Sequence, residues 1–306
     1  MSTYARKETL VIVNPAAHNL PSRKRLDEAD RWLKVQGWQA EWRETEGPGQ
    51  ATELAAAAAE RGLPLLFVCG GDGTLNEAAN GLAGSDTALA TIRAGTANIW
   101  AKEMGLPRRP VKAVMAAVEG DRRRIDLGRA GDRYFLLMAG YGLDGAIARR
   151  VSLGLKSRLG ATTYAIAAIR EALRHRSSAV TLRFDGEQHS ADVLMLVVGN
   201  TRNYAGLVEV TREALVDDGL LDVCVFQGKG TVDNNLHALR TIFRRHLRSK
   251  KVLYRKTRRL ELAWEKPLPV QLDGDAYDRS PTQVEIAPGA LWVAVPKGVS
   301  SPLFRG

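Results

Sequence analysis

One short stretch, Gly70-Gly71-Asp72-Gly73-Thr74, carries the residue types best suited to chemistry in this chain. Glycine lets a backbone come close to a ligand, and a strand–loop–helix junction directs free N–H groups and the positive end of a helix at one spot, which suits a phosphate. Asp72 would repel a bare phosphate, so its position indicates a magnesium ion or a hydroxyl group between the two. The alternative is a tight turn in which Asp72 is only a solvated residue. Neither the Walker ending Gly-Lys-Ser/Thr nor the spaced glycines of dinucleotide folds are found here.

Strands and helices alternate around this stretch. The apolar run Leu65–Cys69 predicts a buried strand before it, and Thr74 with Glu77 has the spacing of a capping box, which predicts a helix beginning at Thr74. Further strands are expected at 10–13, 38–45 and 87–92, and helices at 23–37, 51–61 and 111–118. This alternation predicts a mostly parallel α/β sheet. Ligands bind at the carboxyl ends of such strands, where the chain has Asn14, Thr45, Gly70 to Asp72 and Thr96.

The pattern changes near residue 125, after which short strands separated by turns dominate. They are expected at 134–139, 179–184, 191–198, 220–226, 252–254, 259–264, 270–272, 283–286 and 290–295, with helices at 164–174 and 232–247. We therefore predict an α/β plus mainly β protein. Residues 1–127 would form a three-layer α/β nucleotide-binding domain, and 128–306 an antiparallel β-sandwich domain whose C-terminal tail has room to return to the first. The active site is expected in the cleft.

Size, charge and cysteine content limit the class of protein. With 306 residues the chain can hold two domains with their own cores, and it contains no apolar run long enough to span a membrane and no signal-peptide pattern. We therefore expect a cytoplasmic protein. Cys69 and Cys224 lie in apolar runs, which indicates buried thiols. The net charge of +10 indicates a negatively charged partner, and the aromatic content of 6% favours an anionic membrane or a phosphorylated substrate over nucleic acid.

From Gly70 to Glu77 the chain resembles the nucleotide-binding signature of the diacylglycerol kinase catalytic domain family, which includes sphingosine kinases and has NAD kinases as distant relatives. Motifs similar to those of the family follow in the same order from about residue 10 to 296. The resemblance implies contacts to ATP from Asn14, Thr45, Gly70, Gly71, Asp72, Gly73, Thr74, Asn76, Glu77 and Thr96. Two departures flank Gly95-Thr96-Ala97-Asn98. The family commonly has Pro-Leu before this motif and Asp after it, whereas this chain has Arg93-Ala94 and Ile99.

The loop from Leu215 to Leu220 resembles one that binds a structural magnesium ion in bacterial members of the family. The resemblance implies that the ligands are the Asp218 carboxylate and the carbonyl oxygens of Leu215 and Leu220. Magnesium prefers oxygen ligands and keeps several waters, so this set is reasonable. Without the resemblance, an Asp-Gly hairpin turn that needs no ion would be the favoured interpretation of this loop.

Asp273-Gly274-Asp275 resembles the family's Asp-Gly-Glu motif, in which the third residue is assigned as the base for the acceptor hydroxyl. The resemblance implies that Asp275 is this base, with Asp273 and Asp72 as alternatives. Gly140 to Asp144 resembles the glycine-rich beginning of the family's second domain, and a turn at the end of a strand is an equal interpretation.

These features together predict an ATP-dependent lipid kinase that uses Mg²⁺ and phosphorylates a lipid hydroxyl, in the first place diacylglycerol to give phosphatidic acid. Phosphatidylglycerol, ceramide and a sphingoid base stay open as acceptors. An NAD kinase-like enzyme and a catalytically decayed lipid- or nucleotide-binding regulator are the rival interpretations. Basic residues from Arg240 to Arg259 indicate peripheral binding to the anionic inner face of a membrane, or only a solvated helix face. A homodimer is compatible with the sequence, and no nucleic-acid partner is expected.

Overall fold

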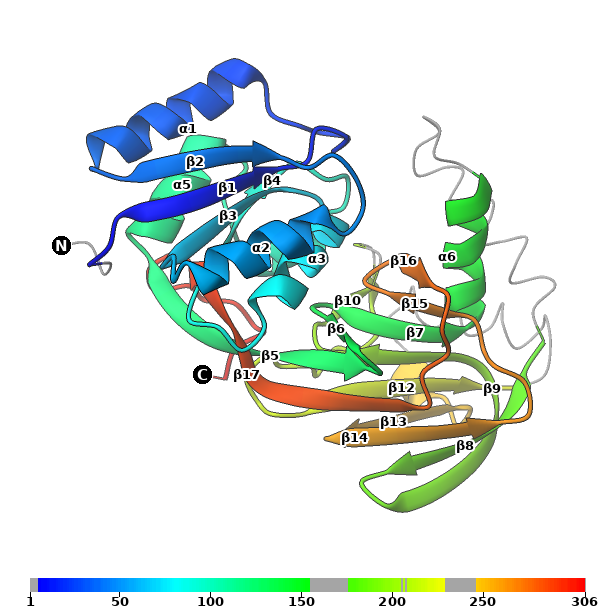
Figure 1. Ribbon diagram of the computed structural model, residues 1–306. Helices are drawn as coiled ribbons and strands as arrows, with labels where there is room; N and C mark the ends of the chain where they lie inside the picture. Colours follow the sequence, from blue (N-terminus) through cyan, green and yellow to red (C-terminus); the bar gives the residue numbers. More distant parts are fainter. Residues whose placement is uncertain (1–4, 155–175, 205, 207, 229–245, 306) are drawn as a thin grey trace. The chain divides into compact units, whose positions relative to one another are not determined.

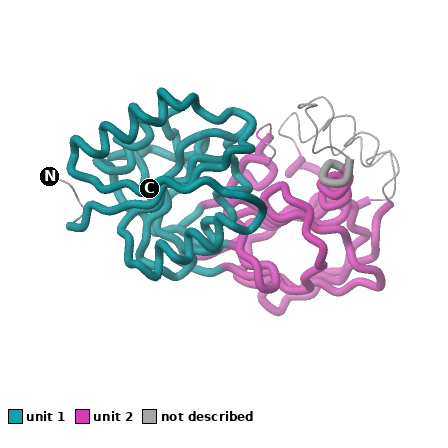
Figure 2. The backbone as a smooth tube through the Cα atoms, turned by 45° about the horizontal axis from the view of Figure 1, so that its top comes forward, with its two compact units in different colours: residues 1–127, 216–218, 287–306 teal, residues 128–215, 219–286 magenta. Residues whose placement is uncertain are grey.

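The computed structural model describes residues 5–154, 176–204, 206, 208–228 and 246–305 (Figure 1). The chain forms two compact units (Figure 2). Unit 1 comprises residues 1–127, 216–218 and 287–306, and unit 2 comprises residues 128–215 and 219–286. The helix expected at 164–174, and all but the last two residues of the one expected at 232–247, lie outside the described residues.

Unit 1 is built on a parallel sheet in the strand order β17-β4-β3-β1-β2. Its strands are β1 (Glu8–Val13), β2 (Gln39–Glu44), β3 (Leu65–Gly70), β4 (Ala88–Arg93) and the last part of β17 (Gln283–Val295). The central strand β3 is buried along its whole length, as a strand covered on both faces must be. The prediction of a mostly parallel α/β sheet is thereby confirmed.

Helices cover both faces of this sheet (Figure 1). They are α1 (Arg23–Val35), α2 (Gln50–Glu60), α3 (Asp72–Leu82), α4 (Ile99–Glu103) and α5 (Pro110–Val118). Helix α1 packs beside α5, and α2 packs beside α3. One core contains Leu33 of α1, Val114 of α5 and Phe67 of β3, and its apolar side chains recur at the spacings that bury one face of each element.

Helix α3 begins two residues earlier than the sequence predicts. Its N-cap is Gly71 and its first residue is Asp72, with no side-chain cap bond, so the capping box expected from Thr74 and Glu77 is wrong. Both side chains bond to other parts of the chain instead, Thr74 to Asn14 and Glu77 to the backbone of Ala51. Helix α3 therefore starts directly at the glycine-rich loop.

Unit 2 is an antiparallel β structure, as predicted for the second half of the chain. Its strands are the last part of β5 (Asp121–Ala130), β6 (Arg133–Phe135), β7 (Met138–Gly142), β8 (Ser178–Phe184), β9 (Glu187–Gly199), β12 (Leu221–Gln227), β13 (Val252–Thr257), β14 (Arg259–Trp264), β15 (Val270–Leu272) and β16 (Asp275–Tyr277), with the first part of β17. Smaller elements are the pair β10 (Asn203–Tyr204) and β11 (Val208–Glu209), the helix α6 (Leu143–Gly154) and a 3₁₀ turn η1 (His246–Arg248). Inward-facing side chains such as Tyr141, Leu196 and Leu260 form its core.

Two strand predictions differ from the structure. The single strand expected at 134–139 is two strands, β6 and β7, because the backbone between them turns to donate hydrogen bonds to Asp273. The two strands expected at 283–286 and 290–295 form one continuous strand, β17, which passes through Gly289 at a positive φ of 57°.

Both cysteines are buried free thiols, as predicted. Burial raises the pKa of Cys69 to about 12 and raises that of Cys224 further. In the part of the chain that the structure describes, we find no helix with the length and apolar character needed to cross a bilayer.

Candidate functional site

The glycine-rich loop lies at the carboxyl end of β3, where it meets the loop that follows β4. A Cβ on Gly70 would lie 2.7 Å from the Cβ of Thr74, and a Cβ on Gly95 would lie 2.5 Å from the Cα of Gly71. Both distances are shorter than real contacts, so a larger residue at position 70 would displace the Thr74 side chain, and one at position 95 would push the two loop backbones apart. The N–H of Ala94 donates to the carbonyl of Gly70 at 3.1 Å and joins the ends of the two strands. Glycine is therefore needed here because two loop backbones approach each other closely.

Asp72 directs its carboxylate at the amino end of α4. Oδ2 accepts a hydrogen bond from the Ile99 N–H at 3.1 Å, and Oδ1 accepts one from the Trp100 N–H at 3.2 Å. Burial raises the pKa of the Asp72 carboxyl, while these two N–H groups and the positive charge of Lys102 oppose the rise. Each carboxylate oxygen has a second lone pair, so Asp72 can still accept a metal ion or a hydroxyl proton. A merely solvated turn residue does not fit these contacts.

Asn14 and Thr74 join the end of β1 to the beginning of α3. Asn14 Nδ2 donates to Thr74 Oγ1 at 2.9 Å, and Asn14 Oδ1 accepts from the N–H of Ala16 at 2.9 Å. The backbone N–H of Asn14 donates to the carbonyl of Cys69, also at 2.9 Å. These bonds bring Asn14, Thr74 and Gly70 together at the carboxyl edge of the sheet.

Asn76 and Glu77, farther along α3, make contacts of another kind. Glu77 Oε2 accepts from the N–H of Ala51 in the first turn of α2 at 3.2 Å, and Asn76 Oδ1 accepts from Asn80 Nδ2 at 3.1 Å. Glu77 thus supplies the missing cap of α2, whose own N-cap residue, Gly49, has no side chain to donate or accept. These two predicted nucleotide contacts take part in helix packing and helix capping.

The two predicted threonine contacts differ in exposure. Thr45 is buried directly after β2, where its N–H donates to the carbonyl of Val13 at 2.9 Å. Thr96 is exposed in the loop between β4 and α4. Asn98 shapes that loop, because its side chain bonds to both the N–H and the carbonyl of Gly95 while its own φ is 46°. Thr45 and Thr96 therefore follow the carboxyl ends of two strands of the same sheet.

In unit 2, the Asp273 carboxylate holds a distant backbone segment in place by hydrogen bonds. Its carboxylate accepts hydrogen bonds from the N–H groups of Leu136, Leu137 and Met138 at 2.7, 2.8 and 2.8 Å. The φ of Asp273 is 52°, and Gly274 follows at 93°. This tight turn presents Asp275, the exposed first residue of β16. Of the two carboxylates in the motif, Asp275 is the one open to solvent.

A buried network supports this turn, and the sequence analysis did not predict it. Gly274 N–H donates to Gln271 Oε1 at 2.6 Å, and Gln271 Nε2 donates to Asp144 Oδ2 at 2.8 Å. Tyr204 donates its hydroxyl to the other oxygen of Asp144. Asp144 is 2% exposed, and burial raises the pKa of its carboxyl. The only signal in the sequence was the Gly140 to Asp144 motif, in which Gly140 is needed because a Cβ there would overlap Asp144.

The predicted magnesium loop holds a positively charged side chain. Arg305 donates from its guanidinium to the carbonyl of Asp218 at 2.5 Å, and from its backbone N–H to Asp217 Oδ1 at 3.0 Å. Arg305 thus engages the Asp218 carbonyl and the Asp217 carboxylate. The ligands that the resemblance implies, the Asp218 carboxylate with two carbonyls, are oxygen atoms, which magnesium prefers. Among the described residues no cluster of three or more His, Cys, Asp or Glu could hold a metal, so carbonyl ligands would be necessary.

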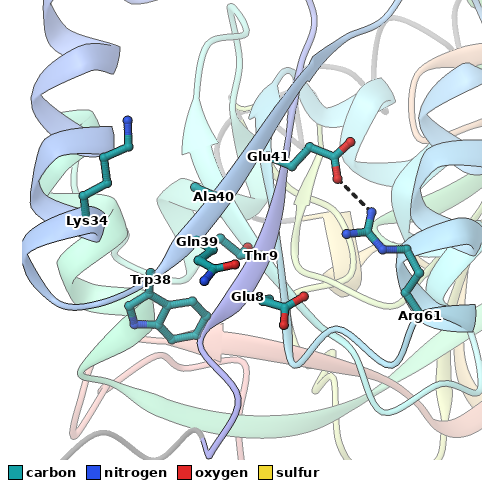
Figure 3. A pocket seen from close by; sticks show the side chains of 8 residues that line it. All are labelled: Glu8, Thr9, Lys34, Trp38, Gln39, Ala40, Glu41 and Arg61. Carbon is teal, nitrogen blue, oxygen red and sulfur yellow. Dashed lines mark hydrogen bonds and ion pairs between the residues drawn. The ribbon is translucent and has the colours of Figure 1, made fainter.

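A cavity of about 420 Å³ lies elsewhere, at the amino ends of β1 and β2 (Figure 3). Glu41 on its wall pairs with Arg43 and Arg61, and Lys34 pairs with Asp30. The charged side chains of its wall are therefore already in ion pairs, with each other or with neighbouring residues. It also lies at the opposite end of the strands from the glycine-rich loop, so we do not assign the nucleotide to it.

In comparisons with known proteins, two family models match consecutive parts of the chain. The diacylglycerol kinase catalytic domain matches residues 8–130, and the YegS C-terminal NAD kinase beta sandwich-like domain matches residues 138–295. A Pseudomonas putida protein named probable lipid kinase YegS-like is 32% identical, over 98% of this chain and 98% of its own. The diacylglycerol kinase of Bacillus subtilis is 27% identical, over 88% of this chain and 90% of its own.

Similarity to a solved structure supports the same fold. The crystal structure of a diacylglycerol kinase from Bacillus anthracis strain Sterne superposes with a TM-score of 0.75 at 22% identity, and the match covers 97% of this chain and 100% of that one. At this identity the superposition is evidence of the fold alone. The two family models and the Pseudomonas relative extend the conclusion to the family. The chain therefore belongs to the lipid kinases that join a diacylglycerol kinase catalytic domain to a YegS-type β-sandwich.

Proposed function

We propose that this protein transfers the γ-phosphate of ATP to the hydroxyl group of a lipid, with diacylglycerol as the first acceptor to test. The observation that carries the proposal is the Asp72 carboxylate, held by the first N–H groups of α4 beside the Gly70–Gly71 loop. Phosphoryl transfer needs the donor phosphates held, their charge neutralised and a hydroxyl aligned with them. A carboxylate fixed beside a phosphate-type loop could hold the cation that neutralises the phosphates, or accept the proton of the hydroxyl.

The residues divide into donor and acceptor roles. The carboxyl edge of unit 1, with Asn14, Gly70, Gly71 and Thr96, is our candidate for the ATP site. Asp275 is our candidate base, because three backbone N–H groups already engage Asp273 while Asp275 is exposed. A positioned base contributes about 10²–10⁴-fold to the rate.

Magnesium enters the proposal at two places. Asp72 would be part of its shell near the donor phosphates, and Asp218 with the carbonyls of Leu215 and Leu220 would hold a structural ion. When bound beside the phosphates, the ion supplies positive charge against the charge of the transferring group.

An anionic membrane surface on the cytoplasmic side is the proposed location of the acceptor. Lys250, Lys251 and Arg255 are exposed on and before β13. Each would contribute about 1 kcal/mol near an anionic bilayer, so the Gln variant of all three should bind such vesicles about a hundredfold more weakly. Activity on a short-chain lipid in detergent should not change. The matched control replaces Arg23, Lys24 and Arg25 in α1, which are also exposed. Equal vesicle binding by both triple variants would contradict the proposed surface.

The deciding experiment is a screen of labelled phosphate transfer from ATP to purified acceptors, with diacylglycerol, phosphatidylglycerol, ceramide, a sphingoid base and NAD in parallel. We expect a lipid product with the wild type and none with Asp72→Asn or Asp275→Asn. Phosphorylation of NAD alone would favour the NAD kinase-like alternative. No product from any acceptor, with intact nucleotide binding, would favour a decayed regulator. Size-exclusion chromatography with light scattering would test the homodimer.

A further inference from the structure

Arg93 stands at the edge of the sheet where the phosphate-type loop begins. It is the last residue of β4, and it lies opposite Gly70 in the register between β3 and β4. The next residue, Ala94, donates its N–H to the carbonyl of Gly70 at 3.1 Å. This chain therefore carries a guanidinium beside the loop.

Among the described residues, the guanidinium of Arg93 has no carboxylate partner at ion-pair distance. Within the same part of the chain its side chain makes one hydrogen bond, from Nη1 to the carbonyl of Leu106, at a long 3.4 Å. Of the residues that the structure describes, none has a carboxylate oxygen within 4.0 Å of it. The side chain is half-buried, and burial lowers the pKa of Arg93, as does the like charge of Arg108, whereas Asp72 opposes both. A desolvated cation next to another cation is unfavourable unless an anion comes between them.

Positive charge exceeds negative charge around Asp72. Lys102 belongs to α4, whose first two N–H groups bond to Asp72, and Arg108 follows Leu106, whose carbonyl accepts from Arg93, by two residues. Both Lys102 and Arg108 are exposed. Both oxygens of Asp72 already accept backbone N–H groups. Arg93, Lys102 and Arg108 thus add three positive charges to segments that contain the carboxylates of Asp72 and Glu103.

We propose that Arg93, together with Lys102 and Arg108, forms a binding site for a phosphate group at the carboxyl end of β4. A guanidinium matches phosphate because its planar fork can donate two parallel hydrogen bonds. Only the identity of the ligand rests on the proposed function. The phosphate belongs either to the terminal part of the nucleotide or to the headgroup of a phospholipid, and both carry the same charged oxygens.

Binding measured by calorimetry without turnover tests the site. The probes are ATP, AMP and inorganic tripolyphosphate, and short-chain phosphatidate in neutral detergent, with the matching diacylglycerol as its uncharged reference. The variants are Arg93→Gln and the charge-preserving Arg93→Lys. The control is Arg109→Gln, which removes the same charge from a side chain that pairs with Glu28 on the surface at 3.3 Å.

Loss of one charge-assisted phosphate contact corresponds to a rise in Kd of about 10- to 100-fold. If the nucleotide is the ligand, Arg93→Gln raises the Kd of ATP and tripolyphosphate by this factor and that of AMP much less. Arg93→Lys, which keeps the charge and loses the planar fork, gives a smaller rise than Arg93→Gln, and Arg109→Gln gives almost none. If the phospholipid is the ligand, the rise is confined to phosphatidate. Binding of every probe within about twofold of the wild type would overturn the proposal.

The melting temperature without ligand separates this site from a structural role. Because Arg93 faces a like charge, the Gln variant should melt at or above the wild type. A lower melting temperature with unchanged binding would mean that the guanidinium only holds the Leu106 carbonyl, and the proposal would be wrong. If the wild type were inactive on every lipid, the proposed function would be wrong. The effect of Arg93→Gln on the Kd of the phosphate probes would still test the binding site by itself.

Discussion

The most informative substitution is Asp273→Asn, compared with Asp275→Asn two residues away. Asp273 binds the backbone between β6 and β7, and Asp275 is exposed. The two changes remove the same charge from the same turn. We expect the first to lower stability and the second to lower turnover, because only the first carboxylate holds a segment of unit 2 in place.

The size of the loss follows from the geometry at Asp273. Oδ1 accepts the N–H groups of Leu137 and Met138, and Oδ2 accepts that of Leu136. In the Asn variant one oxygen can keep its two bonds as a neutral acceptor, but the amide NH₂ then faces the N–H of Leu136. Leu136 is 1% exposed, so its donor is left without water or partner, at about 1–3 kcal/mol. Because the other two hydrogen bonds also lose the charge of the carboxylate, the total loss in the free energy of unfolding is about 2–4 kcal/mol.

Thermal and urea unfolding measure this difference. A loss of about 2–4 kcal/mol corresponds to a fall in Tm of roughly 4–16 °C for a domain of moderate size. Asp275→Asn should stay within about 0.5 kcal/mol of the wild type, as exposed substitutions usually do, and lose about 10²–10⁴-fold in kcat. An Asp273→Asn protein that melts normally and has no turnover, beside an active Asp275→Asn, would refute the reasoning and make Asp273 the base.

Three further predictions follow from single contacts. Glu77→Ala should destabilise the protein by about 1 kcal/mol through the lost cap of α2 and leave the Kd of ATP unchanged in calorimetry. Burial raises the pKa of Asp72 in the folded state, so the folded protein keeps this proton to a higher pH than the unfolded chain does. The free energy of unfolding of the wild type, measured against Asp72→Asn by urea titration, should therefore fall as the pH rises through and above the ordinary carboxyl range. A rise over this range would contradict the prediction. Removing magnesium with a chelator should lower the Tm of the wild type and leave that of Asp218→Ala unchanged. If magnesium was present at a hundredfold excess over its Kd, the free energy of unfolding of the wild type should fall by about 2.7 kcal/mol.

Features that depend on local pattern were predictable from the sequence. The apolar run of β3, the glycines at its end and the regular alternation of helices and strands indicated a parallel sheet with its loops at one edge. The many short strands after residue 125 likewise indicated the antiparallel unit. These inferences worked because burial and turn geometry leave a mark on neighbouring residues.

Features that depend on distant partners were not predictable in this way. Thr74 and Glu77 have capping-box spacing, but their partners lie 60 and 26 residues away. The hydrogen bonds of the Asp273 carboxylate depend on a turn more than 130 residues earlier in the chain. Nothing near Gln271 indicates that it bonds to Asp144. A polar side chain can bond to many groups along the chain. Its actual hydrogen-bond partner is known only when the fold shows which of these groups lies within reach.

The path of β17 has a consequence for synthesis on the ribosome. This strand leaves unit 2 at Ile286 and completes the sheet of unit 1, where Trp292 and Val293 pair with Ala88 and Leu89 of β4. Until the last residues emerge, β4 has one side without a neighbour, and an open strand edge recruits other chains. The N-terminal unit of a nascent chain therefore stays incomplete while all of unit 2 is made. A fragment ending at residue 127 should aggregate, whereas the same fragment joined by a short linker to residues 287–305 should be monomeric.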